Sequence, residues 1–493
     1  MKRVASAILP LIVVDRKAPA ALYQQIYDAY RSAIVGRMLR PGQRVPSTRT
    51  LAKELGVSRL PILNAYAQLL AEGYFQSRVG AGTVVSRSLP DQLPATSARA
   101  ARPVKTAPSL RQLSRRGFTS DKDKNVPWLR GWGPFGVSQV AFEHFPFSVW
   151  NRLITRGCRR SFAKSLDYGE PMGLKKLRSA IANYVRTARG VRCEDDQIMV
   201  VSGSQQALDI TARVLVNPGN SVWIEEPGYR FAHRLFSFHD CRVVPVPVDY
   251  EGMNVREGIR LARHARAALV TPSHQYPLGV TMSASRRLQL LDWAEQYGAW
   301  VIEDDYDSEF RYESMPIASL QGLDSNSRVI YIGTFSKVMF PSLRLGYIIV
   351  PTDLIQAFLS MRLAMDIAPS YFFQAVMADF IEQSHFSRHI RRMRVVYGER
   401  REALTASLRN AFGFRAEIAG GQAGMHLSVT LKGVRDQEIA LRAANQNLWL
   451  LPLSSSYLQK PLRQGFILGF GSTSTGEMPA AVQKLKVVTN RFR

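Results

Sequence analysis

From residue 128 onward, short apolar segments alternate with amphipathic ones, and this alternation limits the possible folds more than any other feature of the chain. The strand candidates include "QIMVVS", "SVWIEE", "AALVTPS", "AWVIEDD" and "RVIYIGT". Between them lie stretches with helical spacing, such as "SQQALDITARVLV" and "SRRLQLLDWAEQYG". Strands that are apolar throughout are typical of a mostly parallel sheet covered by helices on both faces. We therefore predict an α/β fold over residues 128–493, with functional groups at the strand ends.

The first quarter of the chain has a different pattern. After an extension of residues 1–18, "PAALYQQIYDAYRSAIVGRM" spaces apolar residues four apart, as in one face of a helix. Ser47 is placed to cap a second helix, "TRTLAKEL", and Ser58 to cap a third, "RLPILNAYAQLLAEG". Two short strands, "YFQS" and "GTVVS", follow. This order predicts a winged helix-turn-helix domain over residues 19–86.

The charge balance points to a polyanionic partner. The chain has 65 Lys and Arg against 39 Asp and Glu, a net charge of +26. Residues 87–127, rich in Pro, Ser, Ala and Arg, predict a flexible basic linker. Nucleic acid is the usual partner of such a chain, and a basic solvated surface is the alternative that charge alone leaves open.

Cysteine usage and hydropathy bear on the compartment. Three scattered cysteines without metal-ligand spacing fit a reducing cytoplasm better than a disulfide framework. No apolar run reaches the roughly 18 residues of a membrane span. We expect a cytoplasmic protein, and no metal site.

Four strand-end segments carry groups capable of chemistry: "SGSQQ", "EEPGY", "IEDDYDSEF" and "GTFSK" with a following arginine. Each segment alone has an ordinary structural explanation, such as a helix cap, a turn tyrosine, a solvated acidic loop or a lysine reaching solvent. Together they supply an amine, an anion-binding helix start, an aromatic ring and a carboxylate. That combination suits a phosphorylated aromatic aldehyde.

The constellation and its order resemble the fold-type I aminotransferases, which use pyridoxal 5′-phosphate (PLP). The resemblance covers about residues 128–493 and also includes "YGEPMGLKKLRSAIANYVRTARGV" and "TPSHQYPLG". It implies a small C-terminal subdomain over about residues 361–493. It also implies that Lys337 forms the Schiff base with the cofactor and that Asp304 pairs with the pyridinium N–H.

The same resemblance implies roles for the other residues of these segments. Tyr306 would hydrogen-bond the phenolic oxygen of the cofactor, and Tyr229 would stack on its ring. Tyr168 would reach the phosphate held by the other subunit of a dimer. The phosphate itself would be held by a further set of side chains: Ser204, Gln205, Thr334 and Arg344.

The sequence departs from the aminotransferase pattern at two places. Aminotransferases usually carry an arginine near the C-terminus that grips the substrate carboxylate, whereas "GFILGFGS" has Ile467 in that place and Arg463 is out of register. Tyr276 precedes Pro277 where aminotransferases often have Asn. These departures affect the handling of amino-acid substrates rather than cofactor binding.

The N-terminal text "PGQRVPSTRTLAKELGVSR" followed by "AYAQLLAEGYFQSRVGAGTVV" closely resembles the DNA-binding domain of GntR-family regulators. By position in that motif, four residues match DNA contacts: Arg49, Ser58, Arg59 and Gly80. Arg59, at a helix start, would reach a guanine edge, and the others suit phosphates. Leu60 and Leu63 replace polar residues that some relatives carry in the recognition helix.

A GntR-type head, a linker and an aminotransferase-like domain, in that order, resemble the MocR (GabR-type) transcriptional regulators. The resemblance implies a head-to-tail homodimer whose binding to operator DNA depends on PLP and on a small amine or amino acid. An active aminotransferase with an accessory DNA-binding head is the alternative. A sensor of PLP itself is a third possibility.

Overall fold

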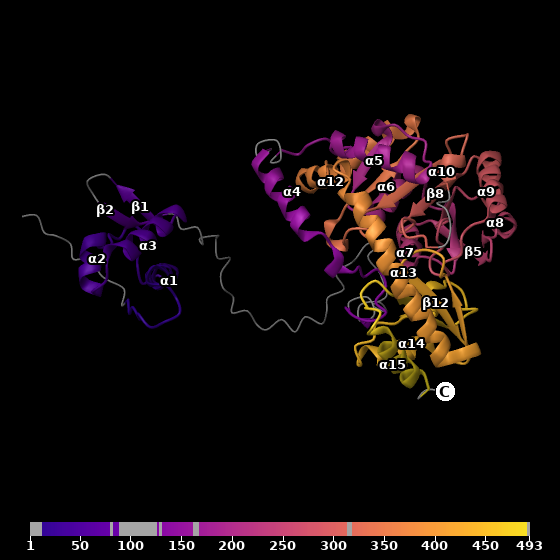
Figure 1. The fold of residues 1–493 in the computed structure, drawn as a ribbon. Coiled ribbons are helices and arrows are strands. Elements are labelled where there is room, and N and C mark those ends of the chain that lie inside the picture. The colour runs from indigo at the N-terminus through magenta and orange to yellow at the C-terminus, as the bar shows by residue number, and fades with distance from the viewer. Residues whose placement is uncertain are drawn as a thin grey trace, which may run out of the picture. The chain divides into compact units, whose positions relative to one another are not determined.

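The computed structural model describes residues 12–78, 82–87, 126–127, 131–160, 167–312 and 318–490. The chain divides into two compact units, Met1–Gln112 and Leu113–Arg493 (Figure 1). Each unit has its own hydrophobic core, so each is described by itself.

The N-terminal unit has the order of elements that the sequence predicts. It comprises α1 (Leu22–Val35), α2 (Thr48–Leu55), α3 (Arg59–Ala71) and an antiparallel hairpin of β1 (Phe75–Arg78) and β2 (Gly82–Val85). The Ser47 hydroxyl accepts the Thr50 N–H at 3.1 Å and so caps α2, as predicted. Gly56, with φ of +63°, ends the same helix in the left-handed conformation that glycine adopts without strain. The winged helix-turn-helix prediction is confirmed.

An aromatic cluster holds this small unit together. The rings of Tyr30, Tyr66 and Phe75 meet edge to face, with centroids 5.1 to 5.6 Å apart. The two tyrosine hydroxyls lie 3.1 Å from each other, and Tyr66 also donates to the Pro46 carbonyl at 3.0 Å. These bonds satisfy polar groups that are otherwise buried. The cluster fixes the orientation of α3 against α1 and the hairpin.

The large unit is built on an eight-stranded sheet. Its strands, in spatial order, are β3 (Ile198–Val201), β10 (Gly346–Ile349), β9 (Val329–Thr334), β8 (Trp300–Asp305), β7 (Ala267–Val270), β4 (Ser221–Glu226), β5 (Arg242–Asp249) and β6 (Gly252–Met253). Strands β9, β8, β7, β4 and β5 pair in parallel, whereas β10 runs antiparallel to both of its neighbours and β6 is antiparallel to β5. The prediction of a mostly parallel sheet is confirmed.

Helices cover both faces of this sheet because alternate strand residues point to opposite sides. On β9, Ile330 and Ile332 belong to the core under α6, whereas Tyr331 belongs to the core under α5. Figure 1 shows these helices around the sheet. The helices of the large unit are α4 (Phe147–Arg160), α5 (Lys175–Arg189), α6 (Ser204–Leu215), α7 (Arg230–Phe238), α8 (Val255–Ala262), α9 (Ala284–Tyr297), α10 (Leu320–Leu323), α11 (Ile355–Met365), α12 (Tyr371–Glu382), α13 (His385–Phe412), α14 (Asp436–Ala444) and α15 (Met478–Asn490).

A second, antiparallel sheet lies in the C-terminal part of this unit, beside α13, α14 and α15 (Figure 1). Its order is β11 (Ala416–Ala419), β12 (His426–Leu431), β14 (Gly465–Gly469) and β13 (Leu451–Pro452). Short 3-10 turns complete the unit: Phe142–His144, Asp195–Gln197, Pro341–Leu343, Thr352–Leu354, Gly413–Arg415 and Leu453–Ser456. None of the helices in the described ranges is both long enough and apolar enough to cross a membrane.

Candidate functional site

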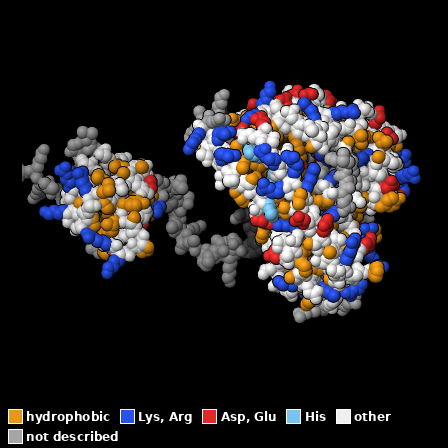
Figure 2. Space-filling view, viewed as in Figure 1, with side chains coloured by type: hydrophobic (Ala, Val, Ile, Leu, Met, Phe, Trp, Pro, Cys, Tyr) orange, Lys and Arg blue, Asp and Glu red, His pale blue; other side chains and the backbone are white. Residues whose placement is uncertain are grey.

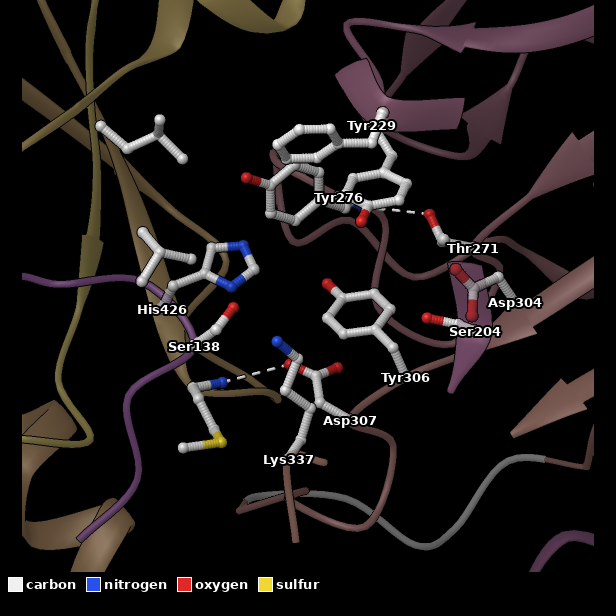
Figure 3. A pocket seen from close by; sticks show the side chains of 14 residues that line it. Ser138, Ser204, Tyr229, Thr271, Tyr276, Asp304, Tyr306, Asp307, Lys337 and His426 are labelled. Carbon is white, nitrogen blue, oxygen red and sulfur yellow. Dashed lines mark hydrogen bonds between the residues drawn. The ribbon is translucent and has the colours of Figure 1, made fainter. Parts of the chain in front are cut away.

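A cavity of about 220 Å³ opens at the carboxyl ends of the parallel strands, where α/β sheets place their sites. Five of the residues singled out in the sequence line it together: Ser204, Tyr229, Asp304, Tyr306 and Lys337. Figure 3 shows Asp304 and Ser204 on one side of the cavity, His426 and Ser138 on the opposite side, and Lys337 between them. Residues from four strand ends and from the second sheet therefore converge on one space.

The three carboxylates at the end of β8 have different surroundings. Glu303 accepts the N–H groups of Leu320 and Gln321, each at 2.9 Å, at the start of α10. Asp305 forms a buried ion pair with Arg189, with 2.7 Å between Nε and Oδ2. Asp304, on the opposite face of the strand, points into the cavity. Strand alternation thus makes Asp304 the carboxylate of β8 that faces the cavity.

Asp304 is buried without a complete set of partners. Its Oδ1 makes no hydrogen bond with any described residue. Burial, together with the charge of Asp305, raises its pKa to about 7, and Lys337 opposes that rise. A buried carboxylate oxygen without a donor is costly, so this geometry favours a ligand that brings an N–H or a positive charge.

Lys337 follows β9 and projects into the same cavity (Figure 3). Burial lowers its pKa from the usual 10.5 to about 8, against the opposing effects of Asp307 and Asp304. A lysine with a lowered pKa has a much larger fraction of neutral amine at neutral pH, and the neutral amine is the form that attacks a carbonyl carbon.

The start of α6 forms an anion-binding corner. Ser204 is the first residue of the helix, and Gly203 before it has a φ of +111° that favours glycine. A Cβ on Gly203 would lie 3.5 Å from a guanidinium nitrogen of Arg344. Arg344 makes no ion pair with any residue of the described ranges, so its guanidinium is available to a ligand phosphate.

The remaining predicted phosphate residues lie around this corner. Thr334 is buried at the end of β9, and its hydroxyl accepts the Ser336 N–H at 3.2 Å. The Gln205 side-chain oxygen accepts the Tyr229 hydroxyl at 3.3 Å, which links the helix start to the stacking tyrosine. Neither Thr334 nor Gln205 lines the cavity itself.

Tyr306 and Tyr276 form part of the aromatic wall of the cavity (Figure 3). The Tyr306 hydroxyl donates to the His274 carbonyl at 3.0 Å. Tyr276 lies edge-on to Tyr229, with ring centroids 5.9 Å apart. Burial raises the pKa of Tyr306 well above its usual value, so the phenol stays protonated and can donate a hydrogen bond.

The structure adds a group of residues to the site that the sequence reasoning did not select. His274 Nδ1 lies 3.0 Å from Asp307 Oδ1, and His426 Nε2 lies 3.2 Å from the Pro277 carbonyl oxygen. His274, Asp307 and His426 bring one potential ligand atom each within 4.8 Å of one another. Their contacts are those of a hydrogen-bonded His–Asp pair beside a second imidazole ring. Asp307 lies within the quoted "IEDDYDSEF", but His426 comes from β12 and gives no local signal.

These residues fit PLP. The partnerless Asp304 oxygen suits the pyridinium N–H, the Gly203 and Arg344 corner suits the phosphate, and the lowered pKa of Lys337 suits attachment to an aldehyde. Tyr168 lies apart from the cavity lining and is 73% exposed.

In the N-terminal unit, Arg49 and Arg59 are both exposed. Arg59 is the first residue of α3, and its Nε donates to the Thr48 hydroxyl at 3.0 Å. Ser58 stands at the N-cap of α3, but the predicted cap is wrong, because its side chain makes no capping hydrogen bond. Gly80 lies outside the described residues.

The first turns of α3 also present apolar side chains to solvent. Leu60 is 65% exposed and Leu63 is 41% exposed. Figure 2 shows Lys and Arg side chains at several points around the edge of this unit in this view, with hydrophobic side chains between them.

Two family models match the chain. Residues 134–473 match aminotransferase class I and II, and residues 22–85 match the bacterial regulatory proteins of the gntR family. The fold is therefore that of an aminotransferase-like unit in a chain that also carries a GntR-type DNA-binding unit, and the cofactor is PLP.

Two named regulators match nearly the whole chain, and a solved aminotransferase matches about three quarters of it. A probable rhizopine catabolism regulatory protein, MocR, of Rhizobium meliloti is 39% identical over 97% of this chain and 95% of its own length. The pyridoxine biosynthesis regulator PdxR of Corynebacterium glutamicum is 30% identical over 94% of each chain. The solved multiple substrate aminotransferase of Thermococcus profundus is 26% identical, with a TM-score of 0.71 over 77% of this chain and 97% of its own. The chain belongs to the MocR/GabR-type transcriptional regulators.

Proposed function

We propose that this regulator senses a small amine through PLP held at Lys337 and that it binds its operator as a head-to-tail homodimer. The observation that carries the proposal is that Lys337 shares one cavity with Asp304, whose Oδ1 has no hydrogen-bond partner among the described residues, in a chain that also exposes Arg59 on a winged helix-turn-helix unit. Each unit holds the groups needed for one half of a ligand-controlled switch.

The protein side chains divide the work of holding the cofactor. PLP, when bound, supplies an aldehyde carbon that exchanges one primary amine for another without net oxidation. Lys337 would offer the resident amine, and Asp304 would keep the ring nitrogen protonated. Tyr229 would pack on the ring, and Tyr306 would hydrogen-bond its phenolic oxygen. The phosphate is assigned to Ser204, Gln205, Thr334 and Arg344.

Exposed residues support the dimer. Tyr168 is 73% exposed and does not line the cavity of its own chain, as expected of a side chain that completes the site of a second copy. Arg344, although placed beside Gly203, is itself exposed. Its exposure leaves room for a second copy at the phosphate corner. The site would then be complete only in the dimer.

The DNA contacts follow from the start of α3. The bond from Arg59 Nε to Thr48 orients the guanidinium, which leaves its terminal nitrogens for a guanine edge. Arg49 and the backbone near Ser58 suit phosphates, as does the wing that contains Gly80. The exposed Leu60 and Leu63 suit contact with thymine methyl groups.

Coupling between the two units requires a ligand with different affinities for two states of the dimer. A differential free energy of about 1–3 kcal/mol produces a change of roughly 5- to 150-fold in operator affinity. Release of Lys337 and filling of the cavity by an amine are the local changes that would favour one state. The names of the relatives, regulators of rhizopine catabolism and of pyridoxine biosynthesis, are consistent with control by small molecules.

Operator binding tests the proposal directly. The DNA upstream of the gene would be titrated with full-length protein, first without cofactor, then with PLP, and then with PLP and a panel of amines. We expect PLP or an amine to change the affinity at least fivefold. Equal operator affinity in all three states of the protein, or no sequence-specific binding in any of them, would contradict the proposal.

The presence of Lys337 and Asp304 in one cavity also favours a second candidate, an active aminotransferase. Lys337 and Asp304 are the groups that transamination needs. Sustained multiple turnover with an amino donor and 2-oxoglutarate, together with the absence of specific DNA binding, would establish the enzyme instead. Response to PLP alone, with no effect of any amine, would identify a sensor of the cofactor.

A further inference from the structure

The wall of the cavity formed by the second sheet has no place for a substrate carboxylate. Ile467 occupies the position where aminotransferases carry the carboxylate-binding arginine. In the sheet register Ile467 lies directly opposite Leu451 on β13 and Ser428 on β12. Residues opposite each other in an antiparallel pair point to the same face. Leu451 lines the cavity, so the Ile467 side chain points to the cavity side of the sheet.

An apolar cluster surrounds Ile467. Its fully buried side chain packs with Leu278, Leu451 and Leu453, and Val137 and Tyr276 lie against the same cluster. Val137, Tyr276 and Leu451 also line the cavity, so the cluster is continuous with its wall. A carboxylate placed against this wall would lose its hydration without gaining a partner, which is costly.

The charges that line the cavity are also unfavourable to a carboxylate. Among the described lining residues, Lys337 is the only Lys or Arg, and it is assigned to the cofactor. Asp307 adds a negative charge next to it (Figure 3). Burial, together with the nearby His274, lowers the pKa of His426 to about 3, so His426 is neutral at physiological pH.

Three arginines outside the cavity lining do not replace the arginine that is missing at position 467. Arg230 places its guanidinium 5.6 Å from the centre of the Phe231 ring and does not line the cavity. Arg463 is exposed. Arg344 lies at the phosphate corner, beside Gly203.

We infer that the effector is a primary amine without a carboxylate, whose remaining part is apolar or carries hydroxyl groups. The apolar part would contact Leu451, Met425 and Phe231, and hydroxyl groups would reach Ser138 or Asp307, all of which line the cavity. This inference rests on the proposed function, because it names the class of ligand for the same site.

Matched pairs of ligands test the inference. Full-length protein loaded with PLP would be titrated with phenylalanine and phenethylamine, with leucine and isoamylamine, and with alanine and ethylamine, while the absorbance of the bound cofactor is followed. The same pairs with free PLP in buffer give the intrinsic ratio of affinities. Relative to that ratio, we expect the protein to favour the carboxylate-free member of at least one pair by tenfold or more. Equal or tighter binding of the amino acid in every pair would overturn the inference.

A matched pair of variants places the preference at Ile467. Ile467→Arg should reduce or reverse the preference by supplying a guanidinium, whereas Val487→Arg adds the same charge at an exposed site on α15 and should leave it unchanged. Circular dichroism checks that the Ile467→Arg protein is folded. If this variant does not fold, the ratios of amine to amino-acid affinity measured on the wild type test the inference by themselves.

Operator binding separates the two proposals. If carboxylate-free amines change the cofactor absorbance but no ligand of the panel changes operator affinity, the proposed function is contradicted while the inferred ligand class of the cavity stands. Amino acids that change both signals, where amines change neither, overturn this inference and support the proposed function.

Discussion

Replacing Asp304 by Asn should have opposite effects on the protein without cofactor and on cofactor binding. Burial raises the pKa of Asp304 to about 7 from 3.8, a difference of about 3 units, which corresponds to about 4 kcal/mol. The unfolded chain ionises Asp304 above about pH 4, whereas the folded chain keeps the proton until about pH 7. The carboxyl group therefore lowers the free energy of unfolding as the pH rises across this window.

Asn has nearly the same shape but does not ionise. At pH 8 the cofactor-free Asp304→Asn protein should therefore be more stable than the wild type, by at most about 4 kcal/mol. Near pH 4 the difference should vanish. Cofactor binding should weaken, because the amide cannot form the charge-assisted hydrogen bond to the pyridinium, which contributes about 1.5–3 kcal/mol, or roughly 10- to 150-fold in affinity.

Urea unfolding followed by tryptophan fluorescence measures the first effect. All seven tryptophans lie within Leu113–Arg493, so the signal reports on the unit that contains the site. Absorbance titration with PLP measures the second effect. Asp353→Asn, at an exposed position, is the control and should change neither quantity. The reasoning is refuted if Asp304→Asn is less stable than the wild type at pH 8, or if it binds PLP as tightly.

Three further predictions concern Lys337 and Arg59. Lys337→Ala should remove the absorbance band of lysine-bound cofactor while circular dichroism stays unchanged; a persistent band would assign the cofactor to another lysine. The rate of PLP attachment should rise with pH and level off above about pH 8, because the pKa of Lys337 is about 8. At pH 7 about 10% of the Lys337 amine is neutral, against about 0.03% for an ordinary lysine. A rate that still rises at pH 10 would contradict the lowered pKa. Arg59→Ala should weaken operator binding by about 1–3 kcal/mol, measured by fluorescence anisotropy, with Arg409→Ala as the charge-matched control; equal affinities would remove Arg59 from the interface.

Much of the fold could be predicted because its signals are local. Apolar runs mark the strands of the large sheet, and the order of helices and turns marks the winged helix. The Ser47 cap was predictable from one residue before a helix. The predicted Ser58 cap was wrong because a serine can occupy the N-cap position of a helix without forming the side-chain hydrogen bond.

The sequence by itself, read with its family resemblance, determined the class of protein, the cofactor and the set of strand-end residues around Lys337. Only the tertiary structure showed why Asp304 rather than Asp305 faces the cavity: alternate strand residues point to opposite sides, and Asp305 is paired with Arg189 on the other side. The structure also placed His426 and the apolar cluster around Ile467 against the cavity. His426 and Ile467 are more than 100 positions away from Asp304 along the chain, so strand register and the packing of two sheets, rather than any local pattern, bring them to the cavity.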